Sequence, residues 1–248
     1  MINIQPIEKP DRANSGLSLD VHSIFYTIQG EGPYCGQPAV FVRLAGCNLQ
    51  CPLCDTEYTS GRKRLSIHEI AYHIADSYAG ERTDKRAPIV VITGGEPFRQ
   101  NLYPLCSLLA HGYGYTVQIE TNGTLGFPEE RFGDLVADLG STLHLNAVYI
   151  VCSPKTGKVH PDIQRTAMAF KYVLKAGDQH EDGLPNTALD HTAHPRVARP
   201  ERNIPIYLQP VDEKDDELNR VNLQAVVASC LAHGHNLQLQ IHKLINVE

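Results

Sequence analysis

The chain has 248 residues, of which 42% are hydrophobic and 20% charged, and its formal net charge is −6. This length allows one α/β domain with a substantial core or two small ones. The acidic balance argues against binding to nucleic-acid phosphates, and no apolar run approaches the ~20 residues of a membrane helix. The polar N-terminus lacks the apolar segment of a secretory signal, so we expect a cytoplasmic protein whose seven cysteines stay reduced.

The first predicted elements are a loose lead-in over residues 1–20 and a strand over residues 39–46, followed by a loop that carries three cysteines. A helix should begin at Ser66, because Glu69 completes a capping box three residues later, and should end by Gly80. A buried strand over 88–93 and a helix over 101–112 follow. Further strands are predicted at 115–123, 147–155, 170–177 and 204–210, then a helix at about 213–233 and a last strand at 237–245.

Strands that alternate with helices predict right-handed βαβ units and a mostly parallel sheet. The chain is too short for a full eight-unit barrel of ~250 residues once its loops are counted. We therefore expect an α/β fold with a partial, open β/α barrel, formed as a single domain over residues 1–248. Residues 178–203 are polar, with three prolines and three histidines, and are predicted to be a mobile surface loop or lid; a histidine metal site there is the less favoured alternative.

Short polar motifs follow five of the predicted strands. They read GCNLQC, TGGEP, ETNGT, CSPK and LQP in chain order. Because chemistry in parallel sheets gathers at the carboxyl ends of the strands, these motifs should meet in one site.

The motif CxxxCxxC places Cys47, Cys51 and Cys54 in the loop after the first predicted strand. Structural zinc needs four closed ligands, so a zinc site would require a histidine as the fourth, and this alternative stays open. Thiolates also hold iron–sulfur clusters, in which four irons ordinarily take four cysteines. Three cysteines would leave one iron open to a ligand from outside the protein. The other four cysteines are scattered and are interpreted as buried, unreactive residues.

The cysteine motif followed by GGEP resembles the radical S-adenosylmethionine (SAM) superfamily. The segment IFYTIQGEGPYCGQPAVFVRLAGCNLQCPLCDT, together with ITGGEP, IETNGT, SPK, LQP and the late HKL, is similar in order and spacing to the 7-carboxy-7-deazaguanine synthase family. The similarity runs over nearly the whole chain from about residue 20. The cysteine motif alone identifies only the superfamily, whereas IQGEG and CDT are specific to this branch.

The resemblance implies a lyase of queuosine biosynthesis with a [4Fe-4S] cluster, SAM and Mg²⁺ as cofactors. Its substrate would be 6-carboxy-5,6,7,8-tetrahydropterin, from which a radical generated on SAM abstracts a hydrogen. Ring contraction with loss of ammonia would give 7-carboxy-7-deazaguanine. The resemblance further implies a one-electron donor such as a flavodoxin and a homodimer, with no nucleic-acid or membrane partner.

The resemblance also assigns residues to each ligand. The cluster would be held by the three motif cysteines, and Mg²⁺ would be contacted by Thr56. The SAM-contacting residues would be Leu53, Cys54, Asp55, Gly95, Glu96, Ser153, Pro154, Lys155 and Gln209. The substrate-contacting residues would be Ile28, Gln29, Gly30, Arg43 and Thr93, with Glu120 and residues 121–124 completing the pocket.

Several of these residues also have a physical reason, and each has a plainer alternative. The Gly94–Gly95 pair would allow close approach of a ligand, and Glu96 would suit the SAM ammonium, although a tight turn with a capping Glu explains the same motif. The guanidinium of Arg43 matches a substrate carboxylate, or else forms a surface salt bridge. Thr56 offers an oxygen ligand for Mg²⁺, or belongs to a simple turn.

Leu53 departs from the superfamily pattern, which usually has an aromatic residue just before the third cysteine. Leucine can cover the adenine of SAM by apolar contact but without ring stacking. Two rival functions remain: a glycyl-radical-enzyme activase, against which IQGEG and CDT argue, and a non-catalytic iron–sulfur electron carrier, which leaves GGEP unexplained. Whether the C-terminal Glu248 reaches the site is open.

Overall fold

The computed structural model of the protein describes residues 3–80, 87–136, 147–189 and 196–247. In these segments the strands are β1 Ser18–Ile28, β2 Pro38–Leu44, β3 Lys63–Ser66, β4 Ile89–Gly94, β5 Val117–Thr121, β6 Val148–Cys152, β7 Ala169–Leu174, β8 Ile206–Pro210 and β9 Asn236–Leu237. The helices are α1 Ile67–Ser77, α2 Tyr103–Ser107, α3 Phe132–Leu135, α4 Pro161–Thr166, α5 Asp216–His233 and α6 Ile241–Leu244. Short turns of other helical types lie at Gly32–Tyr34, Pro97–Arg99 and Leu108–Gly112.

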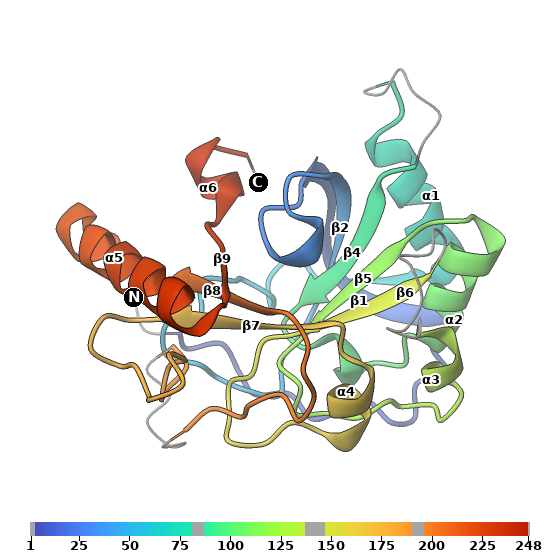
Figure 1. Cartoon of the computed structure of the whole chain (residues 1–248). Coiled ribbons are helices and arrows are strands. Elements are labelled where there is room, and N and C mark those ends of the chain that lie inside the picture. The colour runs from blue at the N-terminus through green and yellow to red at the C-terminus, as the bar shows by residue number, and fades with distance from the viewer. Residues whose placement is uncertain (1–2, 81–86, 137–146, 190–195, 248) are drawn as a thin grey trace.

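The strands form one open sheet in the order β3-β1-β2-β4-β5-β6-β7-β8-β9. Every pairing from β2 to β9 is parallel, whereas β1 runs antiparallel to both β2 and β3. Figure 1 shows α1, α2 and α3 beside the β4–β6 part of the sheet and α5 beside β7 and β8. The open, mostly parallel α/β sheet confirms the predicted fold class.

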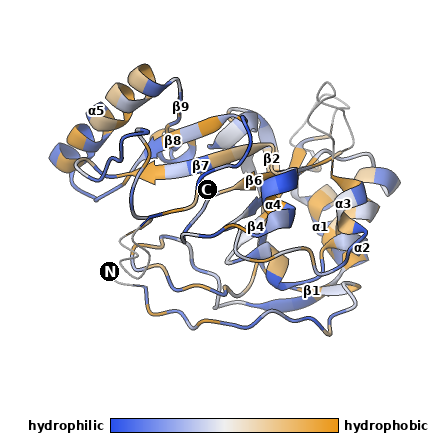
Figure 2. Ribbon diagram, turned by 60° about the horizontal axis from the view of Figure 1, so that its bottom comes forward, coloured by the Kyte–Doolittle hydropathy of each residue, from blue (hydrophilic) through white to orange (hydrophobic). Residues whose placement is uncertain are grey.

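One face of the sheet forms the hydrophobic core with the helices. Ile70 and Ile74 of α1 and Leu105 of α2 pack with strand residues such as Val90 and Ile92, all of them fully buried. Helix α1 begins as predicted, because Ser66 and Glu69 form the reciprocal hydrogen bonds of a capping box. Figure 2 shows hydrophobic residues concentrated on the central strands and on α1, α2 and α3.

The opposite face of the sheet carries polar side chains toward the carboxyl ends of the strands. Successive strand residues point to opposite faces, and the register places Arg43 of β2 beside Thr93 of β4. The same alternation on β7 sends Lys171 to the polar face, while its neighbour Tyr172 is buried on the other side and donates to the carbonyl of Ala198. The pleat therefore assembles the polar residues of several strands on one surface.

The structure differs from the predicted elements at both ends of the sheet. The antiparallel strands β1 and β3 were not predicted, because their partners are set by contacts distant in sequence rather than by a βαβ repeat. The predicted strand over 237–245 is wrong: only Asn236–Leu237 pairs with β8, and the HKL motif lies in α6. The predicted helix over 101–112 begins at Tyr103 with Pro104 in its first turn and ends in a π-helical turn.

Two segments predicted to be loose are held by hydrogen bonds. Residues 3–11 lie against the cysteine loop, where the amide of Glu8 donates to the carbonyl of Cys47 at 2.7 Å. In the described part of 178–203, Arg199 donates to both carboxylate oxygens of Asp182 at 2.7 and 3.0 Å, and Leu184 and Val197 are buried. Of the three histidines there, His191 and His194 lie outside the described residues. No helix in the described ranges has the length and apolar character needed to span a membrane.

Candidate active site

The polar face of the sheet opens into a cavity of about 550 Å³ at the carboxyl ends of the strands. It is lined by most of the predicted site residues: Ile28, Gln29, Arg43, Cys47, Cys51, Leu53, Cys54, Asp55, Thr56, Thr93, Gly95, Ser153, Lys155 and Gln209. Three predicted residues, Gly30, Glu96 and Pro154, do not line it. The motifs that follow different strands thus meet in one place, as the sequence predicts.

Three thiols of the cysteine loop share one wall of this cavity. Cys47 and Cys51 are buried and Cys54 is partly buried, and none forms a disulfide. Burial raises the pKa of all three thiols, and the neighbouring Glu96 and the other two cysteines add to this effect at Cys47, whose pKa rises to about 12. The thiols are therefore protonated at neutral pH until a cation displaces their protons.

This donor set fits an iron–sulfur cluster better than a single metal ion. In the described part of the chain, no three Cys, His, Asp or Glu side chains converge closely enough to hold one ion. A four-iron cluster does not need such convergence, because each thiolate binds a different iron atom. The ammonium of Lys155 lies near Cys51 and Cys54 and partly opposes the rise in the pKa of these two thiols.

The GGEP motif brings the cysteine loop down onto the sheet. A side chain at Gly94 would lie 2.1 Å from the carbonyl oxygen of Leu44, and one at Gly95 would lie 2.1 Å from that of Gly46. These glycines are therefore needed for contact with the chain that leads into Cys47, in addition to any contact with a ligand. Both still line the cavity.

Glu96, which the resemblance assigns to SAM, does not line the cavity. Its carboxylate is fully buried and accepts hydrogen bonds from the amide of Phe98, the hydroxyl of Thr121 and the amide of Asn122, at 2.7 to 3.0 Å. Burial raises its pKa, although these hydrogen bonds oppose the shift. The capping interpretation of this residue is the one that the geometry supports, and Glu96 ties the end of β4 to the end of β5.

The SPK motif places an ammonium beside the cysteine loop. Lys155 donates to the carbonyl and the hydroxyl of Ser153 at 2.9 and 2.6 Å. Burial lowers its pKa, while Cys51 and Cys54 act in the opposite direction. Pro154 is buried and positions these two neighbours without reaching the cavity.

A second wall of the cavity is formed by one buried lysine and two carboxylates. Lys171 is 7% exposed and forms ion pairs with Glu31 and, at 3.5 Å, with Glu120. Burial opposes ionisation of Glu31, but the ammonium of Lys171 outweighs it and holds the pKa of Glu31 at about 2. Burial would likewise lower the pKa of Lys171, yet the two carboxylates raise it above its usual value. Glu31 and Lys171 are therefore both charged at neutral pH.

Amide side chains surround this charged group. Gln29 donates to Glu120 at 3.1 Å and Gln240 donates to Glu31 at 2.8 Å. Gln209, predicted to contact SAM, has its amide near Glu31 at 3.5 Å and accepts from Gln238. The structure thus places Gln209 with the acidic group.

Arg43 and Thr93 lie side by side on β2 and β4 and line the cavity. The guanidinium of Arg43 lies over the ring of Phe25, 5.6 Å from its centroid. Within the described ranges no carboxylate forms an ion pair with Arg43, so the salt-bridge alternative lacks a partner there. An anionic ligand could occupy that place.

The similarity of the chain to characterised proteins extends over its whole length. A family model described as a 4Fe-4S single cluster domain matches residues 28–127. The 7-carboxy-7-deazaguanine synthase of Rhodospirillum rubrum is 39% identical over 100% of both chains. The enzyme of the same name from Rickettsia prowazekii is 35% identical over 95% of this chain and 92% of its own. The chain belongs to the 7-carboxy-7-deazaguanine synthase family. The crystal structure titled QueE from Escherichia coli matches with a TM-score of 0.62 at 23% identity, over 92% of this chain and 95% of its own, and supports the fold.

The sequence did not reveal the contribution of the C-terminal segment to this family member's cavity. The ammonium of Lys243 in α6 lies 3.2 Å from a carboxylate oxygen of Asp55 and of Asp212. Burial would lower the pKa of Lys243, but these two carboxylates outweigh it and raise the pKa. His242 packs against Gly30, where a side chain would lie 2.1 Å from its Nδ1 atom. Gly30 is therefore required by the packing of α6. Glu248 lies outside the described residues.

Lys171, Glu31 and Gln240 were also missed as site residues. The one available signal was a lysine in the middle of the apolar strand sequence AFKYVL, since an unpaired lysine is rarely buried. Its partners could not be read from the sequence because they lie 140 and 51 residues away.

Proposed function

We propose that the protein is a 7-carboxy-7-deazaguanine synthase, a radical SAM lyase that acts as one domain. It converts 6-carboxy-5,6,7,8-tetrahydropterin to 7-carboxy-7-deazaguanine with loss of ammonia, a step toward queuosine. The observation that carries this proposal is the shared cavity, in which Cys47, Cys51 and Cys54 face the same space as Arg43 and the Lys171 group. An electron carrier would need the thiols but would have no use for the second wall.

The cysteine wall is the place for a [4Fe-4S] cluster and SAM. When bound, these groups supply the radical that removes a hydrogen from the substrate. The chain contributes the three thiolates and, next to them, the ammonium of Lys155 and the backbone of Leu53, Asp55 and Gly95. Leu53 presents an apolar side chain to the cavity at the position where the superfamily pattern usually has an aromatic one.

The opposite wall suits the polar pterin ring and its carboxylate. Arg43 provides a fork of N–H donors for the carboxylate, and the hydroxyl of Thr93 lies next to it. Glu31, kept ionised by Lys171, and Glu120 beside it offer acceptors for the N–H groups of the ring. The amide of Gln29 and the backbone of Ile28 complete this wall.

Thr56 is the proposed contact for Mg²⁺. It lines the cavity immediately after the cysteine wall, and Mg²⁺ binds oxygen ligands while it keeps several waters. With one protein oxygen, the ion depends on the substrate for further ligands. The proposal therefore expects Mg²⁺ and substrate to bind together.

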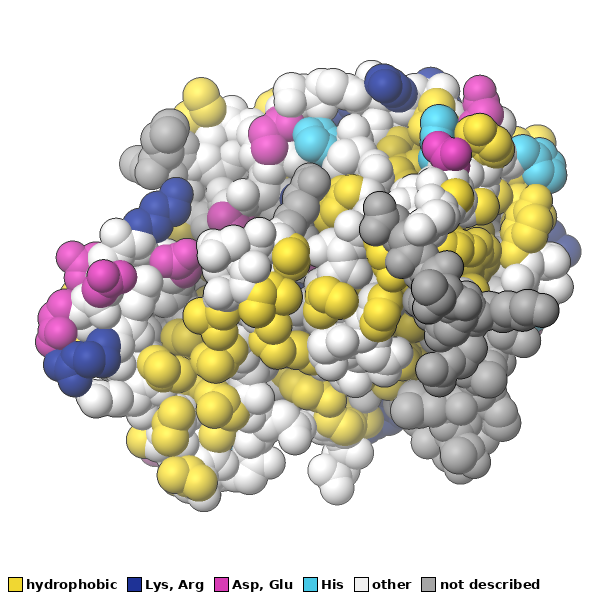
Figure 3. Space-filling model, turned by 90° about the horizontal axis from the view of Figure 1, so that it is seen from above, with side chains coloured by type: hydrophobic (Ala, Val, Ile, Leu, Met, Phe, Trp, Pro, Cys, Tyr) yellow, Lys and Arg dark blue, Asp and Glu magenta, His cyan; other side chains and the backbone are white. Residues whose placement is uncertain are grey.

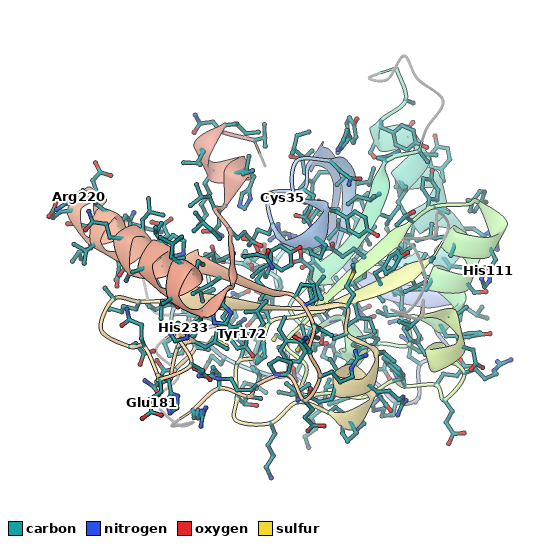
Figure 4. All side chains as sticks on the ribbon, in the orientation of Figure 1. Cys35, His111, Tyr172, Glu181, Arg220 and His233 are labelled. Carbon is teal, nitrogen blue, oxygen red and sulfur yellow. The ribbon has the colours of Figure 1, made fainter. Side chains whose placement is uncertain are left out.

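The proposed partners are a one-electron donor such as a flavodoxin and a second copy of the chain. An exposed apolar face supports the homodimer: Leu218, Val221 and Leu231 of α5 are 51%, 39% and 83% exposed, and Leu237 beside them is 47% exposed. Hydrophobic side chains gather on this side of the molecule next to the charged end of α5 (Figure 3), where Arg220 marks the far end of the helix (Figure 4). Such a surface is more typical of an interface than of a monomer.

The test is turnover by anaerobically reconstituted protein with SAM, Mg²⁺ and a chemical reductant. We expect the carboxy-tetrahydropterin to be consumed and 7-carboxy-7-deazaguanine and ammonia to appear in equal amounts. Cleavage of SAM without consumption of the pterin would contradict the proposed substrate. It would favour an activase, whose radical acts on a partner protein.

A further inference from the structure

The N-terminal segment makes hydrogen bonds along the outer side of the cysteine loop. We call residues 3–8 the N-terminal strap. The backbone amide of Asn3 donates to the carbonyl of Pro52 at 2.9 Å, and its side-chain amide donates to the carbonyl of Cys51 at 3.2 Å. The backbone amide of Glu8 donates to the carbonyl of Cys47 at 2.7 Å. Two of the three proposed cluster ligands thus have their backbone carbonyls held by the strap.

Gln5 is the centre of this contact. Its side-chain amide donates to the carbonyl of Thr56 at 2.8 Å, and its side-chain oxygen accepts from the amide of Tyr58 at 2.8 Å. The Gln50 side chain in turn donates to the backbone carbonyl of Gln5 at 2.6 Å. The Gln5 side chain therefore pairs with the Thr56–Tyr58 backbone as a neighbouring strand would, and it satisfies one acceptor and one donor.

The base of the loop is closed at the same place. Tyr58 is 1% exposed, and its carbonyl accepts from the amide of Gly46, so the two ends of the loop meet beside Gln5. Between these ends lie the three cysteines and the Asp55–Thr56 pair. A change at Gln5 is consequently transmitted first to Thr56, the residue two positions after the last cysteine.

We propose that Gln5 is a positioning residue. It holds the backbone of Thr56 in the place from which the Thr56 hydroxyl contacts Mg²⁺ and the substrate. This inference rests on the proposed function, because it assumes that Thr56 contacts the metal. It also makes Gln5 a support of the active site that no cysteine or glycine motif marks. The strap acts on the loop whether or not the cluster is present, since every contact is made by the chain itself.

The variant Gln5→Glu isolates this role. A glutamate keeps the acceptor for the amide of Tyr58 but faces the carbonyl of Thr56 and the side-chain oxygen of Asn3 with a second acceptor. It therefore loses the bond to Thr56, together with a longer bond within the strap to Asn3. We expect the Mg²⁺ concentration for half-maximal turnover and the substrate KM to rise about tenfold, with cleavage of SAM in the absence of pterin unchanged. The matched control is Ile4→Ala. Because the side chain of Ile4 is 87% exposed, this variant should behave as wild type.

Hydrogen exchange of the cluster-free protein gives a readout that does not depend on activity. We expect faster exchange at the Tyr58 amide in Gln5→Ala, which lacks the acceptor, and wild-type protection in Gln5→Glu and Ile4→Ala. Equal Mg²⁺ and pterin dependence in wild type and Gln5→Glu would overturn the inference, as would wild-type exchange in Gln5→Ala. If wild type itself consumes no pterin, the proposed function fails, and the exchange result still decides whether Gln5 holds the loop.

Discussion

The two walls of the cavity achieve their polarity in opposite ways. The cysteine wall holds three buried thiols whose pKa values are raised, so they stay uncharged until a cation displaces their protons. The acidic wall, formed by Lys171, Glu31 and Glu120, is instead ion-paired within the chain. The comparison indicates that the first wall is built for a resident cofactor and the second for a ligand that comes and goes.

Removing a thiol should have the largest effect of any change in the cavity. For Cys51→Ala we expect loss of cluster iron and of all turnover, because two thiolates cannot retain a cluster that already lacks a fourth protein ligand. Iron and sulfide content and an activity assay measure this. Cys230→Ala on α5, far from the cavity motifs in the sequence, is the control and should keep its iron; a Cys51→Ala protein that still turns over would refute the role of the thiols.

Removing the cation of the acidic wall should destabilise the fold and spare the cluster. Lys171→Met leaves two carboxylates without a cation, and we expect a loss of about 3 kcal/mol in the free energy of unfolding. Iron content should be close to that of wild type. Adding Glu31→Gln to this variant should recover part of the stability; a double variant no more stable than Lys171→Met would show that the two charges are not coupled.

Substitutions of Arg43 test the part of the cavity that is proposed to bind the substrate. We expect Arg43→Lys to lower kcat/KM for the pterin about tenfold, since it keeps the charge but loses the two-pronged geometry, and Arg43→Ala to lower it about a hundredfold. Steady-state kinetics at saturating SAM measures both. Equal effects of the two substitutions would mean that Arg43 contributes charge alone or packing on Phe25.

The acidic wall also predicts a dependence of stability on pH. The pKa of Glu31 is depressed to about 2 in the folded protein from a reference value of 4.5, so its contribution is complete above pH 4.5 and is lost as the pH falls toward 2. Denaturant unfolding between pH 4.5 and 2 measures this. The free energy of unfolding should fall less steeply with decreasing pH in Glu31→Gln than in wild type. Parallel curves for the two proteins would place the acid sensitivity elsewhere.

The smallest expected effect is at Leu53, on the cysteine wall. Leu53→Trp restores an aromatic side chain beside the proposed adenine site, and ring stacking should tighten SAM binding a few-fold, by about 0.5–1.5 kcal/mol. Calorimetric titration of SAM into the reconstituted protein measures this. Unchanged affinity would count against any stacking role at this position.

The difference between the two walls also explains what the sequence could predict. The cysteine wall comes from one short motif, and its neighbours Gly95 and Lys155 come from motifs at strand ends, so the βαβ order alone brings them together. The acidic wall depends on the register of β5 and β7 and on the turn after β1, which join residues 51 to 140 positions apart. No local pattern encodes those distances.

The C-terminal segment shows the same limit in another form. The sequence LQLQI alternates as a half-buried strand does, yet strand pairing ends at Leu237. Gln238 instead bonds the amide of Gly32, and Gln240 bonds the carboxylate of Glu31. These side-chain contacts replace the strand, and they were hidden because the buried pair of Glu31 and Lys171 was not predicted.

The electron paramagnetic resonance spectrum of the reduced, reconstituted protein with and without SAM tests the central claim most directly. We expect a [4Fe-4S] signal that depends on Cys47, Cys51 and Cys54 and changes when SAM is added, because three cysteines leave one iron open to SAM. A cluster signal that SAM leaves unchanged would contradict the account, because the cysteine wall would then be complete without it.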